Sequence, residues 1–169
     1  FDLAGDRDGS ALMNFDVLVI GGGSGGYAAA RTAQEAGANV AIVDPGPLGG
    51  LCILKGCMPT KTILRSSDVM ALMRRSQEFG LMPVQASADL GAINDRKNRI
   101  IGEFAQYRTE QLKDPRFTLF EDLATFISPH EVRVGTRILC AKNFIIATGS
   151  KIAHFSIPGL EEAGYVTSD

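Results

Sequence analysis

A run of glycines between an apolar segment and a segment of small residues constrains the fold of this chain more than any other feature. Residues 17–20 form a short, continuous and mostly β-branched run, which is typical of a strand buried in a parallel sheet. The pattern G-x-G-x-x-G follows within residues 21–26, and residues 27–36 have the composition of a helix that a glycine then ends. A second apolar run over residues 39–43 completes a predicted βαβ unit.

The spacing of the glycines predicts a dinucleotide site. Gly21 would make the tight turn, Gly23 would let the backbone approach a pyrophosphate, and Gly26 would permit close packing of helix on strand. The helix that starts here attracts anions at its N-terminus. Asp44 ends the second strand, 18 residues after Gly26, where a carboxylate can accept hydrogen bonds from a ribose. The alternative is a glycine-rich turn after which the acid merely starts a loop.

The composition excludes several classes of partner. In the 169 residues, 45% are hydrophobic and 21% charged, as in an ordinary globular domain, and the net charge of −2 offers no footprint for nucleic acid. No apolar run approaches the roughly 20 residues of a membrane span. We therefore expect a cytoplasmic protein with neither nucleic-acid nor membrane partners.

Residues 1–12 are expected to be added residues or a linker. No metal site is expected, because His130 and His154 stand apart from other ligands.

Two cysteines, Cys52 and Cys57, lie soon after the glycine pattern. In a regular helix their Cα atoms would be about 8.7 Å apart, beyond the limit of about 7 Å for a disulfide. Gly56 can relax the backbone and Pro59 fits a first helical turn. We therefore expect Cys52 in a tight or distorted turn and Cys57 near a helix N-terminus, where the helix dipole favours a thiolate.

The rest of the chain predicts two long helices and then several short strands. The helices are expected over residues 59–77 and 89–113, the second with Asp89 as its N-cap. Five strand-like runs follow, separated by turn residues: 117–120, 124–127, 131–134, 137–140 and 144–147. Cys140 lies within the fourth run and is predicted to be a buried structural thiol.

Four motifs in this order resemble the flavin-dependent pyridine nucleotide-disulfide oxidoreductases, the family of dihydrolipoamide dehydrogenase, glutathione reductase and mercuric reductase. They are the runs 15–26, 52–61, 145–150 and 157–159. The resemblance implies an α/β fold over residues 13–169, the N-terminal portion of a Rossmann-like FAD-binding domain with a parallel sheet and a small antiparallel β-meander. It also implies that the NAD(P), central and interface domains are absent, so that NAD(P)H would bind to a domain not present here.

The resemblance assigns roles to individual residues. Cys52 would be the interchange thiol that reacts with the substrate, and Cys57 the charge-transfer thiol that faces the flavin. Lys61 would lie near the flavin ring and stabilise negative charge during reduction. The residues implied in FAD binding are Gly21, Gly23, Ser24, Gly25, Gly26, Asp44, Gly50, Lys61, Ala124, Ala147, Thr148 and Gly149.

The chain departs from the family pattern near the cysteines. Leu51 replaces a common threonine, and the run 53–55 replaces one that usually carries asparagine and valine. Lys55, between the two thiols, could favour a thiolate by its charge or could point to water. Asp44 stands where glutamate is commoner, and its shorter side chain has less reach toward a ribose.

These features predict an enzyme that passes electrons between NAD(P)H, FAD, a redox-active Cys52–Cys57 disulfide and a thiol or disulfide substrate. Dihydrolipoamide dehydrogenase is the most similar type, with a small-molecule or lipoyl substrate and a homodimer in the full-length form. A mercuric or glutathione reductase-like enzyme is an alternative. A stand-alone FAD-binding redox module without turnover is another. The 169 residues alone are expected not to oxidise NAD(P)H.

Overall fold

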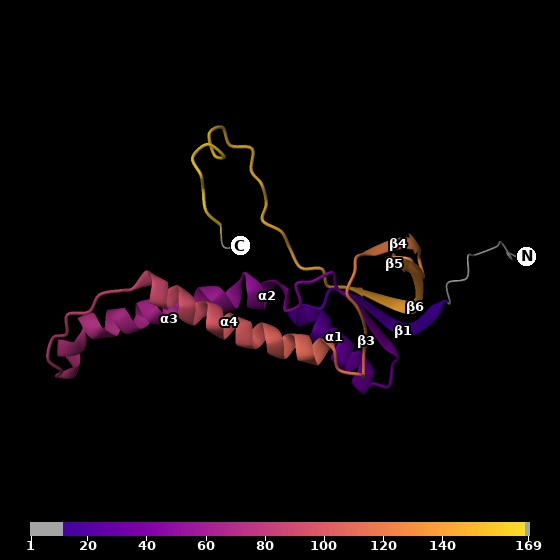
Figure 1. Ribbon diagram of the computed structural model, residues 1–169, viewed down its shortest axis with the longest axis horizontal. Helices are drawn as coiled ribbons and strands as arrows, with labels where there is room; N and C mark the ends of the chain where they lie inside the picture. The colour runs from indigo at the N-terminus through magenta and orange to yellow at the C-terminus, as the bar shows by residue number, and fades with distance from the viewer. Residues whose placement is uncertain (1–11, 168–169) are drawn as a thin grey trace, which may run out of the picture. The chain divides into compact units, whose positions relative to one another are not determined.

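The structure, a computed structural model, describes residues 12–167, so most of the predicted added residues or linker over residues 1–12 lie outside the described part (Figure 1). The chain divides into two compact units. We call the first the sheet unit, which runs up to Gly50 and again over Arg108–Gly149. The second, the helical unit, comprises Leu51–Tyr107 and the residues from Ser150 onward.

One six-stranded sheet forms the sheet unit. Its order is β3-β2-β1-β6-β5-β4, in which β3, β2, β1 and β6 are parallel and β6, β5 and β4 are antiparallel. The predicted α/β fold with a parallel sheet and a small antiparallel meander is confirmed. The strands are β1 (Met13–Ile20), β2 (Val40–Val43), β3 (Thr118–Phe120), β4 (Ala124–Ser128), β5 (Glu131–Val134) and β6 (Arg137–Ile146).

The prediction of two strands over residues 137–140 and 144–147 is wrong, because β6 runs without a break from Arg137 to Ile146. Its partner β1 lies parallel along its length, pairing Asn14 with Cys140 and Val17 with Asn143. The polar residues at the supposed break are satisfied within the sheet. The Lys142 ammonium donates to Asp16 Oδ1 at 2.7 Å, and the Asn143 amide donates to the Asp16 carbonyl at 3.3 Å.

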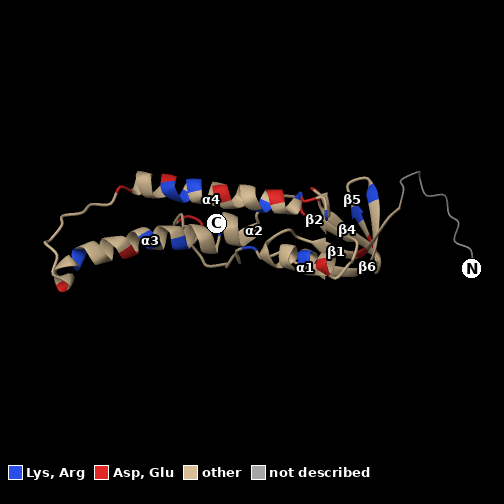
Figure 2. Cartoon of the chain, turned by 90° about the horizontal axis from the view of Figure 1, so that it is seen from below, with Lys and Arg blue, Asp and Glu red and all other residues tan. Residues whose placement is uncertain are grey.

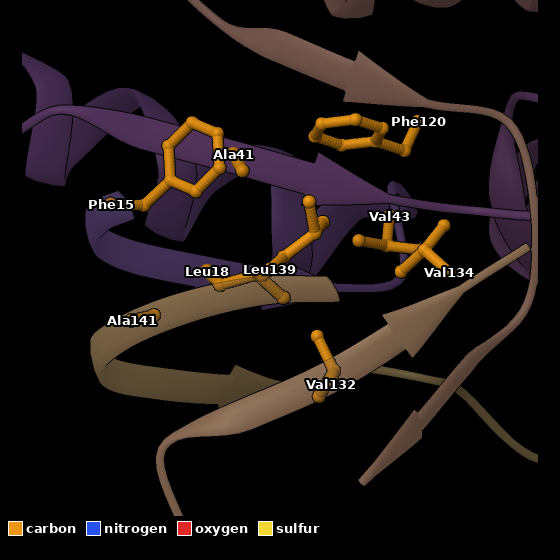
Figure 3. Packing of buried hydrophobic residues seen from close by; sticks show 9 residues of the cluster. All are labelled: Phe15, Leu18, Ala41, Val43, Phe120, Val132, Val134, Leu139 and Ala141. Atoms are coloured by element: carbon orange, nitrogen blue, oxygen red, sulfur yellow. The ribbon is translucent and has the colours of Figure 1, made fainter. Parts of the chain in front are cut away.

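The antiparallel strands fold over one face of the parallel strands. Only residues 121–123 link β3 to β4, although these strands are the two edges of the sheet. Four residue steps span at most about 14 Å, whereas six flat strands would be about 24 Å across, so the sheet must curl. The curl encloses an apolar cluster (Figure 3) of Phe15, Leu18, Ala41, Val43, Phe120, Val132, Val134, Leu139 and Ala141.

The opposite face of the parallel strands packs against α1. Successive strand residues point to opposite faces, so Leu18 lies in the first cluster and Val19 in the second. The second cluster joins the strands to α1 (Ser24–Glu35) and to the last residue of α4 (Leu90–Leu112). Its buried members are Val19, Tyr27, Ala30, Val40, Ile42, Leu112 and Phe117.

The helical unit contains most of α4 together with α3 (Cys57–Arg74), a short 3₁₀ turn η1 (Ser76–Phe79) and nearly all of α2 (Gly50–Leu54). Asp89 Oδ1 accepts the Ala92 N–H at 3.0 Å, which confirms the predicted N-cap. The Arg96 guanidinium joins the two long helices by donating to the Thr62 carbonyl at 3.2 Å. Within residues 12–167, no helix is both long and apolar enough to cross a membrane.

Candidate functional site

The glycine-rich loop is held between the ends of three strands. The Gly21 N–H donates to the Val43 carbonyl at 2.8 Å, and the Ala147 N–H donates to the Ile20 carbonyl at 2.8 Å. Gly21 has a φ of +103°, and a Cβ there would collide with the Ala147 carbonyl oxygen. A Cβ at Gly26 would collide with the Gly21 oxygen. The backbone geometry therefore requires glycine at both positions.

The first turn of α1 presents backbone donors at this loop. Ser24 and Gly25 are exposed, and α1 has neither a side-chain cap nor an acidic residue in its first turn. The first N–H groups of a helix have no acceptor within the helix, and the dipole there favours negative charge. This turn can therefore hold a phosphate group of a cofactor.

The Asp44 carboxylate links two neighbouring loops. Its Oδ2 accepts the Gly22 N–H at 2.6 Å, and its Oδ1 accepts the Gly46 N–H at 2.8 Å. Each oxygen retains acceptor capacity for a further hydrogen bond, such as one from a ribose hydroxyl. A Cβ at Gly22 would lie 3.1 Å from Asp44 Oδ2 and 3.1 Å from a Leu112 methyl, so this glycine is confined on two sides.

The sequence prediction did not include Gly22, whose N–H binds the Asp44 carboxylate. It occupies an unspecified position of the glycine pattern, and the signal that could have identified it is the unbroken run of three glycines at residues 21–23. The sequence prediction also missed Gly46, although it lies only two residues after Asp44 and the run Asp44-Pro45-Gly46 is a local turn signal that could have identified it.

Several other predicted cofactor residues lie at the same edge of the sheet. The backbone of Ala147 and Thr148 packs directly against Gly21. A Cβ at Gly50 would lie 2.5 Å from the Gly23 Cα, so two chain segments approach at backbone distance. These residues follow β1, β2 and β6, whose carboxyl ends form the edge where open α/β sheets bind ligands.

Ala124 and Gly149 lie further along the chain from the loop. Ala124 starts β4, four residues after Phe120, whose carbonyl accepts the Asp44 N–H at 3.0 Å. Gly149 has a φ of +75° and turns the chain after Thr148. Ala147 and Thr148 therefore lie in direct contact with the loop. Ala124 and Gly149 are connected by only a few residues of chain to residues that contact it.

The cysteine segment interrupts a helix between its two thiols. The Leu51 carbonyl accepts the N–H groups of both Lys55 at 2.9 Å and Gly56 at 2.7 Å, which closes α2. Cys57 then starts α3, as predicted, with Gly56 before it. Cys52 lies within the short helix α2 and not in an irregular turn, so that part of the prediction is wrong. The break itself falls between the cysteines, where the sequence placed it.

The break brings the backbone near Cys52 and Cys57 together. A Cβ at Gly56 would lie 3.5 Å from the Cys52 Cα, which is ordinary van der Waals contact. Cys57 is an exposed thiol and Cys52 is half-buried. Lys61 is exposed and lies four residues after Cys57, so both side chains share one face of α3. The disulfide stays a prediction.

Cys140 is half-buried, so the prediction of a buried thiol is wrong. Its neighbours Leu139 and Ala141 point into the core, and alternation along the strand turns Cys140 to the other face. There its sulfur lies 3.8 Å from Glu131 Oε1, beside an open hollow of about 620 Å³. In the part of the chain from residue 12 to 167, no three His, Cys, Asp or Glu side chains group as metal ligands.

The chain is similar to known flavoproteins. A family model for pyridine nucleotide-disulphide oxidoreductases matches residues 15–169. A mercuric reductase of Staphylococcus aureus is 34% identical over 164 residues, which cover 96% of this chain and 29% of the relative. A dihydrolipoyl dehydrogenase of Acholeplasma laidlawii is 35% identical over 150 residues, covering 88% of this chain and 45% of the relative.

A solved structure has the same fold over most of the chain. It is the Cu(II) complex of the HOCl-induced flavoprotein disulfide reductase RclA from Escherichia coli, with a TM-score of 0.67 and 27% identity. The match covers 87% of this chain and 31% of that chain. The chain therefore spans less than half the length of each of these three proteins.

Proposed function

The chain belongs to the pyridine nucleotide-disulphide oxidoreductase family, and from this premise we propose that it is the N-terminal portion of an FAD-binding domain. Members of this family are flavin-dependent oxidoreductases that use FAD and NAD(P)H. The proposed activity is transfer of electrons between NAD(P)H, FAD, the Cys52–Cys57 pair and a thiol or disulfide substrate. The nicotinamide site is assigned to protein segments other than residues 13–169.

The observation that carries the proposal is the backbone cradle at the carboxyl edge of the sheet. A side chain at Gly21 or Gly26 would fill space that the backbone itself occupies, so the loop keeps this tight shape only with glycine at both positions. Gly23 has no side chain that would keep a ligand away from the backbone. The N–H groups of Ser24 and Gly25 would bind the pyrophosphate of FAD, and Asp44 would accept hydrogen bonds from its ribose. Bound FAD would supply the carrier of electrons between NAD(P)H and the cysteine pair.

The cysteine segment is tethered to this cradle by the chain. Cys52 follows Gly50 by two residues, and two residues span at most about 7 Å. Gly50 itself packs on Gly23. We assign the interchange role to Cys52 and the flavin-facing role to Cys57, whose thiolate the N-terminus of α3 would stabilise. Lys61, one turn further along α3, would stabilise negative charge on the reduced flavin.

We propose the type of enzyme and its substrate class as an order of three assignments, because the relatives are of more than one kind. A dihydrolipoamide dehydrogenase-like enzyme, acting as a cytoplasmic homodimer, is the leading assignment. A mercuric or glutathione reductase-like enzyme is the second, since both mercuric reductases and dihydrolipoyl dehydrogenases are similar to the chain. A stand-alone FAD-binding redox module is a third, which predicts FAD binding and thiol chemistry without nicotinamide turnover.

The test places a negative charge where the pyrophosphate would bind. Ser24 is the first residue of α1, so Ser24→Asp should stabilise the helix through its dipole while repelling a phosphate. We expect FAD affinity to fall by at least about tenfold with an unchanged or raised melting temperature. The uncharged Ser24→Asn variant is the matched control and should bind FAD nearly as the parent does. Equal affinity of all three proteins in a fluorescence titration would refute this binding site.

A further inference from the structure

The segment around the cysteines carries only positive charge. Between Asp44 and Asp68 the sequence contains Lys55, Lys61 and Arg65 and no acidic residue. The whole chain, by contrast, has 19 acidic and 17 basic residues, so this stretch departs from the average balance. Figure 2 shows how the Lys, Arg, Asp and Glu residues are distributed along α3 and α4. The N-terminus of α3 adds a further partial positive charge beside Cys57.

Each cysteine has a lysine about one helical turn away. The Lys55 N–H donates to the Leu51 carbonyl, four residues back, so the helical turn of α2 continues to Lys55. Residues three apart on a helix are neighbours, with Cβ atoms about 5–6 Å apart, which places Lys55 beside Cys52. Lys61 follows Cys57 by four residues on α3 and has the same relation to it.

The charge of Lys55 is directed to solvent. Its side chain is exposed, and no ion pair found within residues 12–167 involves it. Two other lysines differ in this respect. Lys113 contacts Glu121 at 3.0 Å and Lys142 contacts Asp16 at 2.7 Å. A cation that no carboxylate neutralises acts on whatever charged molecule approaches the neighbouring thiol.

We propose that Lys55 makes the Cys52–Cys57 pair selective for thiol and disulfide substrates that carry negative charge close to the sulfur. This inference rests on the proposed redox role of the pair. Lys55 acts on the substrate through its charge and takes no part in bond making. The substrate class is therefore a disulfide with a carboxylate or similar anionic group near its sulfur atoms.

The reaction that this charge assists is thiol–disulfide exchange. A cysteine thiolate attacks one substrate sulfur, a new S–S bond forms, the substrate S–S bond breaks, and the leaving sulfur departs with the electron pair as a thiolate. The second cysteine, after losing its proton to solvent, attacks the mixed disulfide and releases the other substrate thiolate. The substrate gains two electrons, and the cysteine pair is oxidised to a disulfide. Lys55 attracts the carboxylate or similar anionic group that the substrate carries beside its sulfur atoms.

The test compares three disulfides of different charge on the reduced 169-residue chain, in a Cys140→Ser background so that only the pair reacts. The probes are dithiobis(nitrobenzoate), a dianion, hydroxyethyl disulfide, which is neutral, and cystamine, a dication. Lys55→Gln should slow the dianion about threefold, quicken the dication about threefold and leave the neutral probe unchanged at low salt. Salt at about 1 M should abolish the difference between parent and variant.

Two further variants complete the design. Lys55→Arg keeps the charge and should keep the parent's preference. Lys113→Gln removes an exposed lysine of the sheet unit and should change none of the three rates. If Lys55→Gln alters all three rates in the same direction, the lysine acts on thiol ionisation and the proposal is refuted. Equal rates for parent and variant with every probe refute it as well.

The outcome can be separated from a failure of the proposed function. Exchange with these probes needs no FAD, so the charge preference is measurable even if the chain does not bind a flavin. Conversely, intact mass of the reacted protein shows whether the pair closes to a disulfide or stops at a mixed disulfide. A pair that never closes would refute the proposed redox role, while the rates of the first exchange step still decide the role of Lys55.

Discussion

The sheet unit and the helical unit differ in how their predicted functional residues are held. At the sheet edge the groups are backbone amides and carbonyls fixed by close contacts, such as the packing of Gly26 on Gly21. Along α3 they are exposed side chains, and none of the residues of this helix is buried. All four residues of β2, by contrast, are buried. The backbone at the sheet edge is therefore fixed by the fold, whereas side chains on the exposed helix α3 can be exchanged without disturbing a core.

The largest expected effect tests how firmly the backbone cradle is fixed. Gly26→Ala would place a Cβ on the Gly21 carbonyl oxygen, and both atoms belong to rigid backbone. We expect a loss of more than about 4 kcal/mol in the free energy of unfolding, measured by urea denaturation.

The control is Gly102→Ala in the exposed part of α4, where a Cβ would meet nothing within 4 Å. Alanine is the better helix former, so this variant should gain up to about 1 kcal/mol. If the two substitutions shift the urea midpoint equally, the close contact in the cradle is not a constraint and the comparison of the two units fails.

A second prediction compares one chemical change in the two units. Leu18 is 0% exposed in the sheet core, and Leu64 is 52% exposed on α3. Leu18→Ala should cost about 3 kcal/mol of stability through lost burial and a cavity, while Leu64→Ala should stay within about 0.5 kcal/mol. Thermal and urea unfolding of both variants measure the difference. A large loss for Leu64→Ala would mean that its side chain is buried in solution, and would contradict the contrast drawn here.

The sequence predicted the parts of the fold that depend on local signals. The βαβ unit was predictable because strand, glycine turn and helix each have a short-range pattern. The helix break between Cys52 and Cys57 was predictable because Gly56 lies there and a continuous helix would hold the thiols too far apart.

The errors fall where distant residues decide the structure. The continuity of β6 depends on its pairing with β1, which is more than a hundred residues away, and on the ion pair between Lys142 and Asp16. The half-exposed state of Cys140 depends on which face of β6 the core occupies. The bond from the Gly22 N–H to Asp44 depends on the loops after β1 and β2 meeting at one edge of the sheet. No pattern within a single segment contains these facts.

The smallest expected effect concerns an exposed ion pair of the sheet unit and its dependence on pH. Asp16 accepts hydrogen bonds from the Lys142 ammonium at 2.7 Å and from the Asn39 N–H at 2.9 Å. These bonds, that of Lys142 first, lower the pKa of Asp16 below its usual value. The unfolded carboxyl titrates near pH 3.9, at about its ordinary pKa. A lowered folded pKa means that the stabilisation is complete above that pH and is lost as the pH falls through the folded value.

Asp16→Asn should therefore be less stable than the parent at neutral pH, and the difference should shrink toward zero as the pH falls from about 5 to about 2. Urea midpoints at several pH values measure it, with Asp95→Asn on the exposed face of α4 as the control. Because the pair is exposed, added salt should reduce the difference at neutral pH as well. A difference that is constant over this range of pH would show that the Asp16 side chain acts by packing alone. In that event the contact between Asp16 and Lys142 of β6 would not depend on charge. The stability of the sheet unit would then come from backbone and core contacts only.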